Sequence, residues 1–69
     1  MLEVKVISRL KELGFKFEDE GKYWRGEVNG EWLEIIFVGV KVLLRSNRGL
    51  ERLKNMKEFV RKYGEFFGV

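Results

Sequence analysis

The sequence lacks histidine, cysteine, proline, alanine, threonine and glutamine, and it contains one aspartate and two serines. Without histidine or cysteine there is no base to activate a serine or thiol nucleophile, no thiolate, and no zinc ligand except carboxylates. The absence of cysteine also excludes disulfides. We therefore expect a protein that is not an enzyme and holds no cofactor or metal.

At 69 residues the chain has room for one small domain, covering residues 1–69. Its composition, 45% hydrophobic and 36% charged, is too apolar for intrinsic disorder. The longest apolar run, Ile35–Val40, is too short to cross a bilayer, and the N-terminus has no signal-peptide pattern, so we expect a cytoplasmic protein. The dominance of lysine and glutamate, without glutamine or cysteine, is typical of proteins from hyperthermophiles.

The net charge of +3 is unevenly distributed. Residues 1–38 carry more acidic than basic side chains, whereas residues 39–69 carry far more basic ones. This asymmetry predicts a surface in the C-terminal half that binds an anion.

The first residues predict an amphipathic helix over 2–13. Its apolar side chains recur at helical spacing: Leu2, Val6, Leu10 and Leu13. Gly14 can end the helix, and Phe15 then occupies the position that packs back on Leu10 in a Schellman cap. The alternation in residues 2–6 would also suit a strand, but a strand there leaves too few residues for a helix before Gly14.

Two tight turns predict a three-stranded meander over residues 22–46. A short extended piece, 15–18, and an acidic turn ending at Gly21 come first, and we expect this turn to be solvated and not to bind a metal. Asn29-Gly30 is the strongest hairpin signal, and Gly39-Val40 can form the next turn. The resulting register pairs Trp24 with Ile35, Arg25 with Glu34, Tyr23 with Ile36, Ile35 with Leu44, and Glu34 with Arg45.

Strand alternation divides these residues into two faces. We expect one face to form the core: Trp24, Val28, Leu33, Ile35, Phe37, Val42 and Leu44. The other face carries Tyr23, Arg25, Trp32, Glu34, Ile36, Lys41, Leu43 and Arg45.

A second amphipathic helix is predicted over 48–67, with capping side chains at Ser46 and Asn47. Its apolar stripe begins at Leu53, and Glu58 and Lys62 have the spacing of a favourable ion pair on its polar side. The predicted fold class is therefore α+β, with the order helix, three-stranded antiparallel meander, helix (α-β-β-β-α).

A basic cluster surrounds the predicted start of this second helix: Arg45, Arg48 and Arg52, with Lys41, Lys54 and Arg25 as supporting charges. Free amides and the helix dipole favour an anion there, and guanidinium groups bind phosphate in a bidentate manner. We expect a module that binds nucleic acid through its phosphates. The alternative is that these arginines are ordinary solvated side chains, with Arg45 paired to Glu34 and Arg52 to a neighbouring acid.

The second sheet face has an unusual apolar set: Tyr23, Trp32, Ile36 and Leu43. An antiparallel sheet face turned to water is mostly polar, so we expect something to cover these residues. A second copy of the chain or another protein is the favoured interpretation. Base stacking, with Arg25, Lys41 and Arg45 around the aromatic rings, and a helix crossing to this side are the alternatives.

The order helix, three antiparallel strands, helix resembles the double-stranded-RNA-binding domain along the whole chain. That resemblance implies phosphate contacts from the start of the second helix, where Arg45, Arg48 and Arg52 stand, although Asn29-Gly30 replaces the family's Gly-Pro-x-His turn. Residues 10–24, with the run Leu-Lys-Glu-Leu-Gly-Phe, also resemble the start of HicA-type messenger-RNA-cleaving toxins. The catalytic Gly-Ser-His of those toxins reads Gly21-Lys22-Tyr23 here, which implies that their activity is lost.

Overall fold

A computed structural model describes residues 2–69. It contains two helices and a five-stranded antiparallel sheet, which confirms the α+β class. The elements in chain order are α1 (Leu2–Glu12), β1 (Lys16–Glu18), the short 3₁₀ turn η1 (Asp19–Gly21), β2 (Tyr23–Val28), β3 (Glu31–Val38), β4 (Lys41–Ser46), β5 (Gly49–Leu53) and α2 (Met56–Phe67). Each strand pairs with the next one along the chain, so the sheet is a simple meander.

The two predicted hairpins and their register are confirmed. Asn29 and Gly30 connect β2 to β3 with φ angles of 54° and 81°, the positive values that a type I′ turn requires. Trp24 then pairs with Ile35, and Ile35 with Leu44. A two-residue turn leaves no freedom in the register, and therefore it also determines which side chains share a face.

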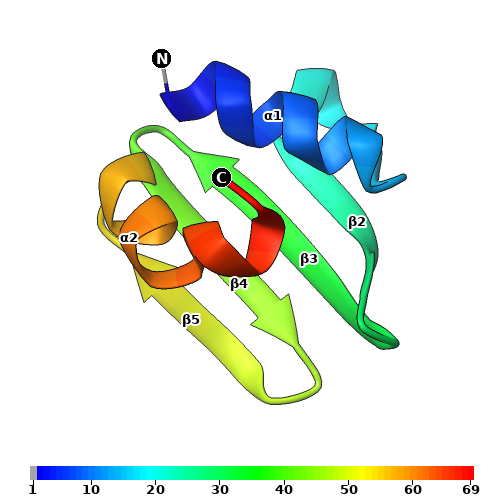
Figure 1. The fold of residues 1–69 in the computed structure, drawn as a ribbon. Helices are drawn as coiled ribbons and strands as arrows, with labels where there is room; N and C mark the ends of the chain where they lie inside the picture. Colours follow the sequence, from blue (N-terminus) through cyan, green and yellow to red (C-terminus); the bar gives the residue numbers. More distant parts are fainter. Residues whose placement is uncertain (1) are drawn as a thin grey trace.

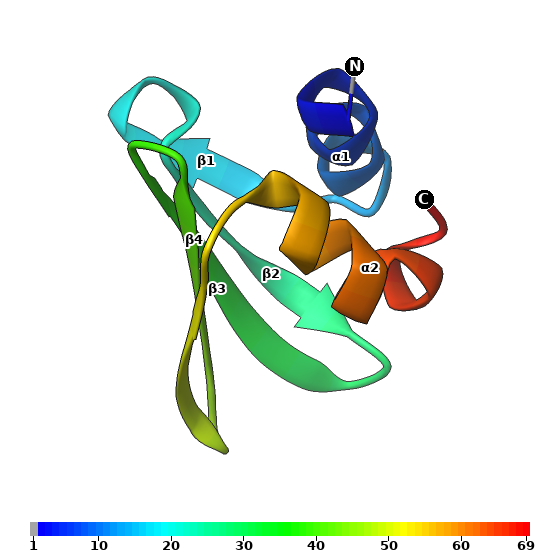
Figure 2. The same ribbon diagram turned by 90° about the vertical axis from the view of Figure 1, so that its left-hand side faces the viewer.

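Within residues 2–69, both helices pack on the same face of the sheet and no helix lies on the opposite face (Figures 1 and 2). The core lies between the helices and the sheet, as the alternation predicts. Its buried side chains are Val6, Leu10, Phe15, Trp24, Leu33, Ile35, Val42, Leu44, Leu53, Phe59 and Phe67. Val28 and Phe37 of the predicted core are partly buried against this cluster.

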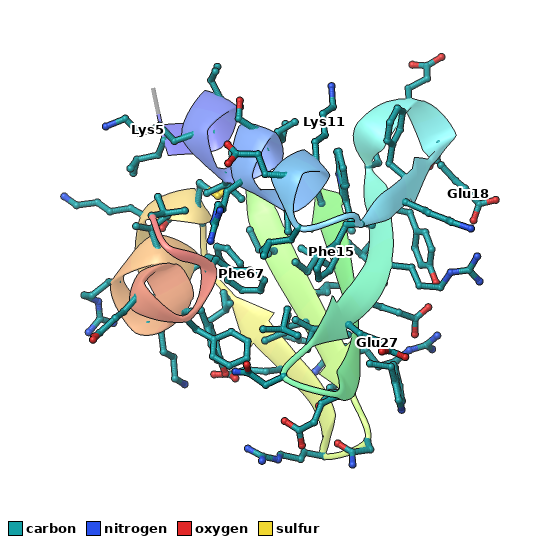
Figure 3. The ribbon with its side chains drawn as sticks, turned by 45° about the vertical axis from the view of Figure 1, so that its right-hand side comes forward. Lys5, Lys11, Phe15, Glu18, Glu27 and Phe67 are labelled. Atoms are coloured by element: carbon teal, nitrogen blue, oxygen red, sulfur yellow. The ribbon has the colours of Figure 1, made fainter. Side chains whose placement is uncertain are left out.

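Helix α1 forms where the spacing predicts it. The backbone N–H of Phe15 donates to the carbonyl of Leu10 at 3.0 Å, and Phe15 turns into the core at 5% exposure. Figure 3 shows Phe15 beside Phe67 between the helix layer and the sheet, and their ring centroids are 6.2 Å apart. Within residues 2–69, neither helix has the length and apolarity needed to cross a membrane.

The predicted start of the second helix is wrong. Residues 49–53 form β5, which pairs with β4, and α2 begins at Met56. Ser46 and Asn47 therefore do not cap a helix; the cap is Asn55, whose Oδ1 accepts the backbone N–H of Glu58 at 2.9 Å. The spacing of Leu53 with the apolar residues of α2 fits a helix equally well, so periodicity alone does not separate the strand from the helix.

The sheet has five strands where the sequence predicts three. Besides β5, the extended piece after α1 forms β1, which pairs with β2 so that Lys16 lies opposite Arg25. A three-residue strand is too short to show any alternation. The double-stranded-RNA-binding-domain topology is therefore not confirmed, because that topology places the second helix directly after the third strand.

Candidate binding surface on the open face of the sheet

The sheet face without helices, here called the open face, carries most of the predicted binding residues. The pairing register places most of them in two neighbouring rows across the strands, whereas Trp32, opposite Glu27, and Lys41, opposite Val38, lie outside these rows. One row contains Glu18, Tyr23, Ile36, Leu43 and Arg52, and the next contains Lys16, Arg25, Glu34, Arg45 and Leu50. The basic set and the apolar set, which are predicted as separate sites, therefore share one surface.

Glu34 is the buried anchor of the open face, with 7% of its surface exposed. Its Oε2 accepts the hydroxyl of Tyr23, and its Oε1 accepts Arg45 Nε at 2.6 Å and lies 2.5 Å from Arg45 Nη2. The alternative interpretation of Arg45, an ion pair with Glu34 across the sheet, is thus confirmed. Because both carboxylate oxygens are used, Glu34 holds Tyr23 and Arg45 in fixed positions on an otherwise open surface.

The apolar side chains of the open face remain uncovered by the protein's own helices. Ile36 and Leu43 are half-buried among their strand neighbours, and Trp32 is 43% exposed. The alternative in which a helix crosses to this side is therefore wrong. Among the described residues, Tyr23, Ile36 and Leu43 therefore form an apolar strip on the face without helices, and Trp32 lies apart from this strip, beyond Glu34 on β3.

Basic side chains lie at one end of this strip and in the rows beside it. Arg52 is directly opposite Leu43 in the register of β5 with β4, and Arg25 is opposite Glu34 in the register of β2 with β3. Both arginines are exposed, as is Lys41 at the start of β4. None of these three side chains forms an ion pair with any residue from 2 to 69, so their charges are available to an anionic ligand.

The phosphate clamp at a helix start is wrong in its geometry. Arg48 lies in the turn between β4 and β5, where its Nη2 is 3.4 Å from Glu31 Oε1. Lys54 precedes α2, and its backbone N–H donates to the carboxylate of Glu58. Arg45 and Arg52 lie in strands, so the helix dipole of α2 does not support them.

No protein-family model, curated protein or solved structure matches the chain.

A second surface feature, not predicted from the sequence, is a hollow of about 360 Å³ on the helix side of the sheet. It lies between the tips of the two hairpins β2–β3 and β4–β5 and the second half of α2. Its lining comprises Val28, Glu31, Trp32, Leu33, Leu44, Ser46, Arg48, Gly49, Leu50, Glu51, Tyr63, Phe66 and Phe67. The strands extend past the end of α2, as Figure 1 shows, and this leaves the inner face of the sheet uncovered near the tips.

Glu51 and Tyr63 line one side of the hollow and form an ionisable cluster with Lys62. Glu51 accepts hydrogen bonds from both Lys62 and Tyr63, so the predicted pair of Lys62 with Glu58 is replaced by one between α2 and β5. The bond from Lys62 is the main reason that the pKa of Glu51 is lowered. Burial, followed by the hydrogen bond to Glu51, raises the pKa of Tyr63 to about 12.

This cluster predicts a loss of stability at high pH. The phenol of Tyr63 has a higher pKa in the folded protein than its ordinary 10.0, so its stabilising contribution is complete below pH 10 and is lost as the pH rises towards 12. We expect the free energy of unfolding in urea to fall over this range, and to fall less in Tyr63→Phe. An absorbance titration of the wild type that shows every tyrosine ionising near pH 10 would contradict this expectation.

Proposed function

We propose that the protein is a non-enzymatic module that binds single-stranded nucleic acid on its open face. The observation that carries the proposal is the position of Arg52 beside Leu43 at one end of the apolar strip, with Arg25 three strands from Arg52 in the neighbouring row. Basic groups along an aromatic surface are the combination that single-strand binders use, because phosphates follow the charges while bases stack on the rings.

The shape of the surface favours a single strand over a duplex. A duplex keeps its bases stacked inside, and only unpaired bases can lie flat against the rings of Trp32 and Tyr23. Arg45 is held by Glu34 and remains half-exposed at its side chain, so it can meet a phosphate without first losing much conformational freedom. These features support contacts that do not depend strongly on sequence.

The test is a titration of fluorescein-labelled oligothymidine or oligouridine, followed by fluorescence anisotropy at several salt concentrations. Neutralising about three phosphates of a single strand gives a slope near −2 in a plot of log K against log salt, so affinity falls roughly fifteenfold between 50 and 200 mM. A blunt hairpin duplex of equal charge is the control and binds more weakly. Equal binding of both, or binding that does not change with salt, would contradict the proposal.

A second candidate function is self-association through the same face, and the uncovered apolar strip favours it. If two copies pack there, Trp32→Lys places a charge in the contact and converts a dimer into a monomer in sedimentation velocity. Lys57→Glu, on the exposed side of α2, serves as the control and leaves the dimer intact. A wild type that sediments as a monomer at high concentration would remove this candidate.

A further inference from the structure

The hollow between the hairpin tips and α2 is lined by apolar and aromatic side chains against which a flat ring can pack. Its floor is the inner face of the sheet, formed by Val28, Leu33 and Leu44. Its other wall consists of aromatic side chains from the second half of α2, and Phe66 there is 45% exposed. A volume of about 360 Å³ lies in the range of small-molecule pockets and accommodates one nucleobase with its sugar.

Two opposite charges line the mouth of this hollow. Glu31 comes from the tip of the β2–β3 hairpin and Arg48 from the tip of the β4–β5 hairpin, and their closest atoms are 3.4 Å apart. The ion pair is long, and the two side chains are 45% and 81% exposed, so little stability is lost when it opens. When the ion pair opens, both carboxylate oxygens of Glu31 can accept hydrogen bonds, and beside them the guanidinium of Arg48 can donate hydrogen bonds.

We propose that the hollow binds a guanine base, with its ring against the aromatic wall and its polar edge at the mouth. Guanine carries two neighbouring donors, N1–H and the 2-amino group, which match the two oxygens of Glu31. Next to them it carries two acceptors, O6 and N7, which match the guanidinium of Arg48. Adenine has one amino donor and isolated ring-nitrogen acceptors, so it cannot form paired hydrogen bonds with both Glu31 and Arg48.

The hollow and the open face share two residues at the hairpin tips. Trp32 and Leu50 line the hollow, and both are exposed on strands that also form the open face. A strand that crosses the open face can therefore continue around the tips and place an unpaired guanine in the hollow. This connection to a strand rests on the function proposed above, whereas the binding of a free guanine nucleotide does not.

The first experiment measures free nucleotides, so that the hollow is tested alone. GMP, IMP and AMP have the same charge but differ at the polar edge of the base, and each is titrated while methyl and aromatic NMR signals are recorded. We expect GMP to shift signals of Val28, Leu33, Leu44 and Phe66 and to bind about tenfold more tightly than AMP, with IMP between them. Equal affinities for GMP and AMP would overturn the proposal.

Two variants and one control locate the site. Val28→Phe fills the hollow and abolishes the GMP shifts, whereas Val38→Phe, at an exposed position outside the lining, leaves them unchanged. Glu31→Gln leaves the hollow open but removes the preference for GMP over AMP. This variant therefore tests the guanine site even if Val28→Phe does not fold. A preference for GMP that survives Glu31→Gln would contradict the assigned role of this carboxylate.

A strand experiment separates the two proposals. Oligothymidine with one terminal guanosine binds the wild type about tenfold more tightly than oligothymidine alone, and Val28→Phe removes this advantage without changing the salt dependence. If oligothymidine does not bind but GMP does, the proposed function fails and the base site remains. If oligothymidine binds and the guanosine adds nothing, the guanine site fails and the proposed function remains.

Discussion

Replacing Arg25 and Arg52 together by glutamate is expected to weaken single-strand binding by about 100-fold at low salt. Each substitution removes a phosphate contact and adds a repulsive charge beside the strip of Tyr23, Ile36 and Leu43, and affinity for a single strand depends steeply on the number of neutralised phosphates. Neither arginine makes an ion pair within residues 2–69, so the fold loses little. Fluorescence anisotropy with oligothymidine measures the change.

The matched control reverses the same number of charges elsewhere. Lys57 and Arg61 are exposed on α2, on the helix side of the molecule, and Lys57→Glu with Arg61→Glu produces the same net charge as the first variant. This control should lose only the small part of the affinity that comes from overall charge. If both double variants weaken binding equally, binding depends on the net charge of the protein and not on the open face. Circular dichroism and thermal unfolding verify that both variants fold.

Gly26→Ala is expected to cost about 3 kcal/mol of unfolding free energy, near the upper end for the insertion of one methyl group into a packed core. A Cβ on Gly26 would lie 2.7 Å from two ring carbons of Phe15 and 2.9 Å from a third. Phe15 cannot easily move away, because it is 5% exposed and its ring packs edge-on against Phe67. Urea unfolding of the variant and the wild type gives the difference.

A second substitution shows whether this ring contact causes the loss. In Gly26→Ala with Phe15→Leu, the smaller side chain makes room for the methyl group, so the double variant is destabilised by less than the sum of the two single variants. The matched control is Gly30→Ala, which has no heavy atom near its Cβ and is strained only by its positive φ. Additive effects in the double variant would contradict the steric explanation.

The turns explain how much of the fold was predictable. Asn29-Gly30 determines the register of β2 with β3, and that register places Trp24 and Ile35 in the core. Glu34 and Arg45 are matched by the same reasoning. These predictions hold because a hairpin register depends on two adjacent residues and not on the rest of the fold.

The boundary between β5 and α2 was not predictable from periodicity. Leu53 continues the helical spacing of the α2 residues, yet it is a buried strand residue paired with Val42. The local signal that indicates the true start is Asn55 with Glu58 three residues later, the pattern of an N-cap and its partner. The predicted helix start at residue 48 placed Arg52 at the beginning of a helix, whereas Arg52 lies on the open face. The clamp hypothesis depended on that placement.

The hollow could not be predicted, because it depends on how far each strand extends past the helices. The two charged residues at its mouth, Glu31 and Arg48, belong to different hairpins and are 17 positions apart in the chain. Their proximity follows only when the β4–β5 hairpin is known. The Glu51 contact with Lys62 and Tyr63 has the same origin, since it requires Glu51 to lie in a strand beneath α2.

The most direct test of the open-face account is a two-dimensional amide NMR titration with oligothymidine, at low salt and again at physiological salt. We expect shifts at Arg25, Trp32, Leu43 and Arg52, which weaken as salt is added, while the exposed side of α2 remains unchanged. Shifts confined to α2, or spectra that do not change even at low salt, would contradict it.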